Sequence, residues 1–236
     1  MTLELENVRV DELFPSTVLS YVWPDSERLN LDLRSLILAK EKESGGIQTS
    51  NAGGWHSEKD LQDWDSDCVR VLCSRIVLFC QETVRRIIGT GEGKFLENWR
   101  VQAWANISRS GNYNKLHHHS RNLNLWSGVY YVDLGDDGTK NFKPARIIFA
   151  DQNRVEANDR PELAVRFAVR PEPGLMLSFP SSLAHRVEAH DGRRERITVA
   201  FNLRHELFTT LAYTIEEKKA LKAQKALGAN HPGNYG

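Results

Sequence analysis

The sequence contains few cysteines, and their spacing excludes the usual cysteine-based sites. Its three cysteines are Cys68, Cys73 and Cys80, which are five and seven residues apart. This spacing matches no CxxC metal-binding or redox motif. All three lie in a segment with helical periodicity, where thiols are ordinarily buried or half-buried packing groups. We therefore assign them no chemistry.

The sequence also lacks net charge and long apolar runs. Lysine and arginine together number 31, as do aspartate and glutamate, so no net field attracts the protein to nucleic acid or to an anionic membrane. No segment approaches the roughly 20 uninterrupted apolar residues of a membrane-spanning helix. The N-terminus lacks the basic and apolar regions of a signal peptide. These absences favour a cytoplasmic protein that acts on a small-molecule substrate, without a nucleic acid or membrane partner. The oligomeric state stays open, with a homodimer as one option.

Hydrophobic periodicity divides the chain into two kinds of segment. Apolar residues recur every three to four positions in 29–43 and in 61–88, and glycines follow both runs, so both patterns indicate helices. From residue 95 the period changes to two, in short runs of aromatic and β-branched residues separated by Gly, Pro, Asp and Asn. Such strands are typical of a β-sandwich, jelly roll or barrel. Residues 212–227 have the composition of a charged helix.

Three consecutive histidines stand ahead of a predicted strand, in YNKLHHHSRNLNLWSGVYYVD (113–133). Along an extended chain the side chains alternate between two faces. His117 and His119 therefore point the same way and can chelate one metal ion, while His118 points away. A solvated polar loop is the ordinary alternative for a histidine cluster of this kind.

A third metal ligand is available from a later turn. His185 follows Pro-Ser-Ser between two predicted strands, and His190 is the competing candidate five residues later. Three neutral imidazoles suit Fe, Zn, Cu or Ni, and a facial set with open positions is typical of non-haem iron oxygenases. Arg196, at the start of the next strand and beside Thr198, can form a fork for a carboxylate. Taken singly, His185 could be a hydrogen-bonded loop residue and Arg196 a surface charge. Their joint order favours a metal site.

Five short segments that occur in a fixed order carry a resemblance to a known family. They are SNAGGWHS, YNKLHHHS, SGVYYV, PGLMLSFPSSLAHRV and ERITVAFN, and the match extends over residues 13–202. Together they resemble a family of 2-oxoglutarate/Fe(II)-dependent oxygenases. The resemblance implies a mainly β protein with flanking helices, folded as a double-stranded β-helix, that is, a cupin-like jelly roll.

The expected domain organisation follows from the periodicity and the resemblance together. We expect residues 1–236 to form a single domain. Residues 1–92 would be a largely helical part that packs on the barrel, and residues 93–206 would form the jelly-roll core. Residues 207–236 would form a C-terminal helix and tail.

The resemblance also implies a ligand set. Fe(II) would be held by His117, His119 and His185, and Arg196 would bind 2-oxoglutarate. Thr198 stands where the family has serine and keeps a hydroxyl group there. Because unperturbed imidazoles protonate near pH ~6.5, a three-histidine site is expected to lose its metal in mildly acidic solution.

Several further residues are candidates for the co-substrate or the substrate. Asn106 could donate to the C1 carboxylate of 2-oxoglutarate, and the hydroxyl group of Tyr131 could reach the same molecule. Trp55 and His56, in the glycine-rich segment, and Trp104 are candidates for a lid or a substrate wall. For all of them, packing or hydrogen bonding within the core is the competing interpretation.

The activity implied by the resemblance is oxygenation that uses Fe(II), 2-oxoglutarate and O2. The simplest form hydroxylates a small molecule and releases succinate and CO2. One alternative is a three-histidine cupin-type dioxygenase that does not use 2-oxoglutarate, and another is a non-catalytic jelly-roll binding module. Arg196 favours the first, because an enzyme that binds its substrate directly needs no carboxylate fork behind the metal. The sequence identifies neither the substrate nor the choice between hydroxylation, desaturation and cyclisation.

Overall fold

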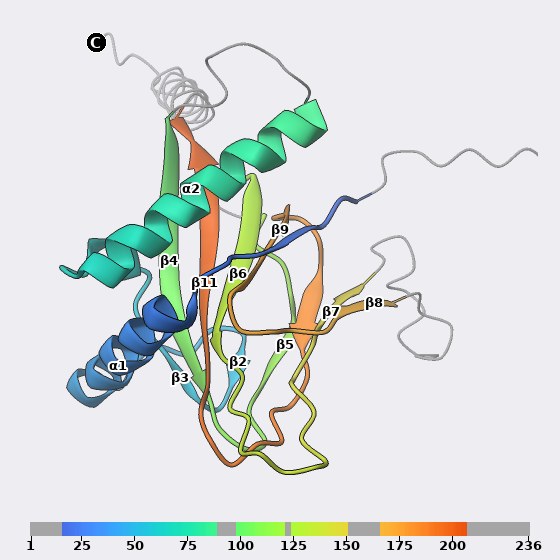
Figure 1. Cartoon of the computed structure of the whole chain (residues 1–236). Coiled ribbons are helices and arrows are strands. Elements are labelled where there is room, and N and C mark those ends of the chain that lie inside the picture. The colour runs from blue at the N-terminus through green and yellow to red at the C-terminus, as the bar shows by residue number, and fades with distance from the viewer. Residues whose placement is uncertain (1–15, 89–97, 121–123, 151–165, 207–236) are drawn as a thin grey trace, which may run out of the picture.

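Two antiparallel β-sheets form the body of the protein (Figure 1), which a computed structural model describes over residues 16–88, 98–120, 124–150 and 166–206. The larger sheet has the strand order β1 (Leu19–Val22), β9 (Leu175–Pro180), β6 (Trp126–Asp133), β11 (Arg196–His205), β4 (Trp99–Ser108) and β3 (Trp55–His56). The smaller sheet has the order β2 (Asn51–Ala52), β5 (Tyr113–His117), β10 (His185–Val187), β7 (Ile147–Ala150) and β8 (Arg166–Val169). Neighbouring strands come from distant parts of the sequence, and the two sheets form the expected jelly roll.

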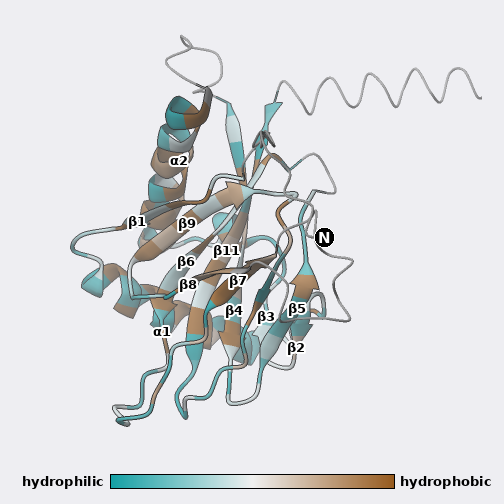
Figure 2. Cartoon of the chain, turned by 90° about the vertical axis from the view of Figure 1, so that its right-hand side faces the viewer, coloured by the Kyte–Doolittle hydropathy of each residue, from teal (hydrophilic) through white to brown (hydrophobic). Residues whose placement is uncertain are grey.

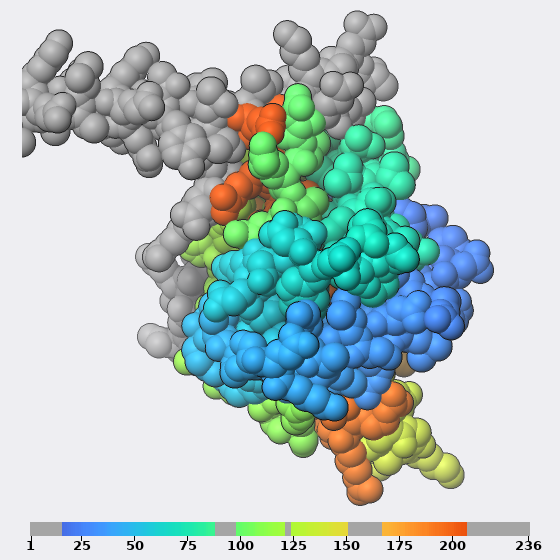
Figure 3. Space-filling model, turned by 90° about the vertical axis from the view of Figure 1, so that its left-hand side faces the viewer, coloured from blue at the N-terminus to red at the C-terminus, as the bar shows by residue number. Residues whose placement is uncertain are grey.

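Two helices cover the outer face of the larger sheet. They are α1 (Glu27–Glu43) and α2 (Asp67–Ile88), and a single turn of 3-10 helix, η1 (Leu61–Asp63), precedes α2. α1 contacts β6, while α2 contacts β4 and β9. In Figure 3 these helices fill much of the visible face. The smaller sheet therefore lies on the side of the larger sheet that faces away from the helices.

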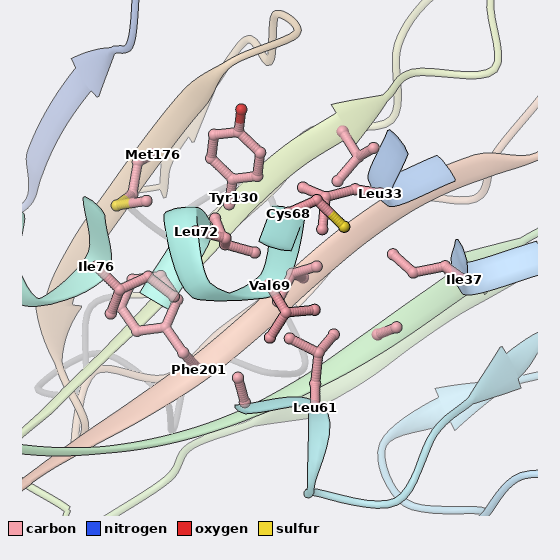
Figure 4. Close-up of a cluster of buried hydrophobic side chains, with 14 of the residues drawn as sticks. Leu33, Ile37, Leu61, Cys68, Val69, Leu72, Ile76, Tyr130, Met176 and Phe201 are labelled. Atoms are coloured by element: carbon pink, nitrogen blue, oxygen red, sulfur yellow. The ribbon is translucent and has the colours of Figure 1, made fainter. Parts of the chain in front are cut away.

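The core between the helices and the larger sheet is apolar because alternate residues of each strand point toward the helices. On β11 these residues are Ile197, Val199, Phe201 and Leu203, all buried. Figure 4 shows the facing side chains of the helices and of neighbouring strands, among them Leu33, Ile37, Val69, Leu72, Ile76, Tyr130 and Met176. The other face of β11 is left for polar residues that point between the sheets. Figure 2 shows hydrophobic segments on the strands and mostly hydrophilic residues in the loops at the lower end of that view.

The periodicity located most elements correctly. α1 ends at Glu43 as expected. The alternating runs WRVQAWANIS, LWSGVYYVDL, ARIIFAD, AVRFAVRP, GLMLSFP, HRVEAH and RITVAFNL, which predict strands, coincide in that order with β4, β6, β7, β8, β9, β10 and β11. The single helix expected over 61–88 is divided into η1 and α2. The backbone of Trp64 is extended and ends η1, so α2 begins only at Asp67. The short strands β1, β2, β3 and β5 were not predicted, and β5 is the strand that ends with His117.

Two further expectations concern the C-terminal segment and the division into domains. The helix predicted at 212–227 lies outside the described residues, and the division into one domain with those boundaries stays a prediction. Among the helices within the described ranges, none is both long and apolar enough to cross a membrane.

Gly128 provides a test of how tightly β6 packs between β9 and β11. A Cβ atom at this position would overlap with the Leu177 carbonyl oxygen and with the Phe201 ring. We expect Gly128→Ala to lower the free energy of unfolding by about 1–3 kcal/mol, as overpacking of a core does. Urea unfolding measures this change. Gly45→Ala is the control, because nothing lies within 4 Å of its added Cβ. Equal stability of the two variants would contradict the packing described here.

Candidate metal centre and co-substrate pocket

Three histidine side chains converge between the two sheets. His117 ends β5, His119 lies two residues further along, and His185 begins β10. One ring nitrogen from each lies within 4.8 Å of the others. The ring centroids are 4.8 Å apart for His117 and His119, 4.4 Å for His117 and His185, and 5.2 Å for His119 and His185. This is the convergence of two alternate histidines and one remote histidine that the sequence predicted.

Backbone pairing positions these rings. β10 pairs with β5 in antiparallel register, with His185 opposite His117. The backbone N–H of His119 donates to the Ser181 carbonyl (2.7 Å), which ties the second histidine to the turn before β10. His118 is exposed, as alternation predicts, and its Nδ1 lies 2.8 Å from the Ser120 hydroxyl oxygen.

The three imidazoles are neutral over the physiological pH range. Burial and the neighbouring histidines lower the pKa of His119 to about 2 and that of His185 to about 3, and burial also lowers the pKa of His117. The Nδ1 protons of His117 and His185 are donated to the carbonyls of Lys115 (2.7 Å) and Leu183 (2.9 Å). Their Nε2 atoms therefore carry the lone pairs, as metal binding requires.

Arg196 supplies a buried positive charge in the same cavity. Its side chain is on the inward face of β11 and the residue is only 3% exposed, yet its Nε atom has no hydrogen-bond partner. The guanidinium carbon lies 5.5 Å from the centroid of the Tyr131 ring, and the Tyr131 hydroxyl group is also buried without a partner. No carboxylate within the described residues forms an ion pair with Arg196. Unpaired buried groups of this kind are costly, so the geometry indicates a place for an anionic ligand.

A chain of buried hydrogen bonds connects the inward face of β11 to the metal centre. The Ser127 hydroxyl donates to Asn202 Oδ1 (2.8 Å), so its oxygen accepts the proton of the Ser181 hydroxyl (2.8 Å). Ser181 in turn accepts the backbone N–H of His119 through its carbonyl. This chain explains why the Ser-Gly-Val-Tyr-Tyr, Phe-Pro-Ser-Ser and Phe-Asn segments occur together.

The cavity that contains these groups has a volume of about 620 Å³. Its walls include the other inward-facing candidates Asn106, Tyr131 and Thr198. Trp104 and His56 form a stacked pair with centroids 5.7 Å apart, and Trp104 also contacts the His119 ring at 5.7 Å. This volume is in the range of small-molecule sites.

A family model matches the part of the chain that carries these groups. Residues 102–202 match the family described as "Putative 2OG-Fe(II) oxygenase". The matched segment contains all the candidate metal and co-substrate residues, and the match indicates a 2-oxoglutarate-dependent non-haem iron oxygenase. It implies Fe(II), 2-oxoglutarate and O2, and it favours a 2-oxoglutarate-dependent enzyme over the two alternatives that the sequence left open. No curated protein matches the sequence.

Solved structures of three oxygenases share the fold. A prolyl-4-hydroxylase from Pseudomonas putida is 13% identical, with a TM-score of 0.56, over 80% of this chain and 92% of that one. The α-ketoglutarate-dependent carbocyclase SnoK from nogalamycin biosynthesis is 13% identical, with a TM-score of 0.57, over 80% and 79%. A Trichoplax adhaerens prolyl hydroxylase, solved with a hypoxia-inducible-factor peptide, is 11% identical, with a TM-score of 0.55, over 82% and 86%. At these identities the likeness concerns the fold.

Two candidate residues of the oxygenase are not in the cavity. Trp55 was expected at a substrate wall, but it belongs to the core beneath the helices, where its indole N–H donates to the Ser44 carbonyl (2.8 Å). Its neighbour His56 points the opposite way, into the cavity, because adjacent strand residues alternate. His190, the competitor of His185, is buried elsewhere, and its Nε2–H donates to the Arg194 carbonyl (2.8 Å).

Sequence reasoning missed Lys59, which lines the cavity of the oxygenase. Its Nζ atom lies 4.9 Å from the centroid of the Trp104 ring. A single lysine before a short helical turn looks like any surface charge, so no pattern in the sequence identified it.

The lowered pKa values argue against the expectation that mild acid removes the metal. Because burial lowers the pKa of His119 to about 2 and that of His185 to about 3, and also lowers that of His117, protons compete less with a metal ion than they do at an ordinary imidazole. We expect the dissociation constant for Fe(II), measured by anaerobic equilibrium dialysis, to change by less than about threefold between pH 5 and pH 8. An affinity that falls about tenfold per unit below pH 6.5 would show ordinary protonation of a ligand and contradict this geometry.

Proposed function

We propose that this oxygenase hydroxylates a small organic molecule, with Fe(II) bound by His117, His119 and His185 and with 2-oxoglutarate bound by Arg196. The observation that carries the proposal is the buried guanidinium of Arg196, which has no carboxylate partner within the described residues and lies in the same cavity as three converging neutral imidazoles. A metal centre with a separate carboxylate receptor is what a 2-oxoglutarate-dependent reaction needs.

The donor set fits Fe(II). Three neutral nitrogen ligands on one side of a metal leave other coordination positions for co-substrate and oxygen. The carbonyls of Lys115 and Leu183 hold two of the rings in the tautomer that exposes Nε2. No carboxylate joins the three histidines within the described residues, so the bound cation keeps its full charge and attracts anions strongly.

The wall around Arg196 fits the distal carboxylate of 2-oxoglutarate. A carboxylate can accept hydrogen bonds from the Arg196 guanidinium and from the Tyr131 hydroxyl, which lie next to each other and have no acidic partner within the described residues. The Thr198 side chain is on the same inward face of β11, opposite Asn106 of β4. We assign Thr198 to the same carboxylate and Asn106 to the carboxylate next to the keto group.

The proposed reaction converts substrate, 2-oxoglutarate and O2 into hydroxylated substrate, succinate and CO2. Bound Fe(II) supplies the activation of O2, coupled to oxidative decarboxylation of 2-oxoglutarate. The protein positions both organic molecules and excludes water. His56 and Trp104 form the wall nearest His119, where we place the substrate carbon that is oxidised.

The histidine triplet provides a matched pair of variants for the metal centre. We expect His119→Ala to lose Fe(II) binding in anaerobic dialysis and to lose succinate formation. His118→Ala should keep both, because its exposed ring bonds to Ser120 and not to the cluster. Circular dichroism checks that both variants are folded. Loss of iron from both variants, or from neither, would contradict the assigned ligands.

Arg196→Met tests the co-substrate receptor. We expect the half-saturating concentration of 2-oxoglutarate for succinate release to rise by at least about 100-fold, because a charge-assisted contact in a buried site is lost. Binding of 2-oxoglutarate should raise the melting temperature of the iron-loaded wild type but not that of the variant. Arg193→Met is the control, since the Arg193 side chain is 87% exposed. Wild-type turnover in Arg196→Met would remove Arg196 from the proposal.

A further inference from the structure

The cavity has an excess of positive charge that 2-oxoglutarate alone does not explain. Its charged lining residues are Lys59, Lys115 and Arg196, and the described lining includes no aspartate or glutamate. Of these, Arg196 is assigned above to the co-substrate, and Lys115 belongs to an exposed part of the wall. Lys59 is half-buried beside the metal centre, so its ammonium group is the positive charge that an anionic ligand would stabilise most.

Lys59 lies over the aromatic wall of the cavity. Its ammonium nitrogen is 4.9 Å from the Trp104 ring centroid, and Trp104 contacts both His56 and His119. Within the described residues, no hydrogen-bond acceptor and no carboxylate pairs with this ammonium group. Burial and the positive charge of Arg204 lower the pKa of Lys59. Arg204 therefore repels the Lys59 ammonium group, and no carboxylate within the described residues offsets this repulsion.

Arg204 strengthens this charge imbalance. Its guanidinium donates to the neutral amide oxygens of Asn124 (2.8 Å) and Gln102 (3.3 Å). These bonds fix the position of the Arg204 guanidinium without neutralising it. Two neighbouring cations that lack an acidic partner in a half-buried site repel each other, and an anion bound between them and the metal would relieve that repulsion.

Lys59 and Arg196 belong to different parts of the cavity wall. On β11, Arg196 is opposite Ser108 of β4, whereas Ala200 is opposite Trp104, the ring beneath Lys59. Four residues of antiparallel strand span roughly 13 Å between these backbone positions. Because the Lys59 ammonium group lies over the Trp104 ring, a co-substrate held at Arg196 would leave Lys59 available for a second anion.

We propose that the substrate is a small carboxylic acid whose carboxylate pairs with Lys59 and whose apolar part lies against Trp104. This inference rests on the proposed function, since it places the substrate beside the metal and the co-substrate at Arg196. Lys59 is then a residue that determines specificity, because it favours acids over neutral molecules of the same shape.

The test compares two probes of nearly the same shape, one anionic and one neutral. Benzoate and benzamide are titrated by calorimetry, without oxygen, into the protein loaded with Fe(II) and saturating 2-oxoglutarate. We expect benzoate to bind wild type at least tenfold more tightly than benzamide. Lys59→Met should weaken benzoate by about 10- to 100-fold, as expected for loss of one charge-assisted contact. Lys59→Arg should keep most of the affinity, and exposed Lys143→Met should keep all of it.

The affinity for 2-oxoglutarate distinguishes failure of the substrate inference from failure of the proposed function. We expect the affinity of Lys59→Met for 2-oxoglutarate to stay within about twofold of wild type. Equal affinity for the two probes, or no effect of Lys59→Met on benzoate, would overturn the substrate inference alone. Weakened 2-oxoglutarate binding in Lys59→Met would show that Lys59 binds the co-substrate, and this result would also overturn the substrate inference. If wild type does not bind 2-oxoglutarate, the proposed function fails first and the inference fails with it.

Discussion

The antiparallel pairing of β5 with β10 is the interaction on which the metal centre depends. It places His185 directly opposite His117, and the bond from His119 to the Ser181 carbonyl brings in the third ring. Side chains on a strand alternate between faces, so a slip of one residue would turn His185 away from the cluster. β10 is also paired with β7 on its other side, and this second pairing opposes such a slip.

β11 joins the hydrophobic core to the chemistry of the site. Its outward residues are buried beneath the helices, while Arg196, Thr198 and Asn202 point between the sheets. The apolar contacts of one face contribute the free energy that holds the polar face in place. A buried guanidinium without a carboxylate partner is unfavourable by itself. It is tolerated here because the strand that carries it is fixed on both edges, by β4 and by β6.

The sequence predicted the parts of the site that depend on local geometry. The shared face of His117 and His119 follows from strand alternation, and the return of His185 follows from the turn before a strand. Trp55 shows the limit, because it was grouped with His56 although adjacent strand residues face opposite ways. Lys59 could not have been found, since its role depends on the distant strand β4, which places Trp104 beneath it. Contacts between elements far apart in sequence leave no local pattern.

The charges around the cavity link the binding affinities of the metal, the co-substrate and the substrate. The charges that lower the pKa values of His117 and His119 come from other histidines and from Lys59, and no carboxylate contributes. A divalent cation at the histidines would therefore be repelled by Lys59 until an anion neutralises it. An anion bound beside the metal strengthens metal binding, and thermodynamic reciprocity requires the metal to strengthen anion binding by the same factor. Metal, co-substrate and an acidic substrate should therefore bind with positive cooperativity, although the protein chain itself has no net charge.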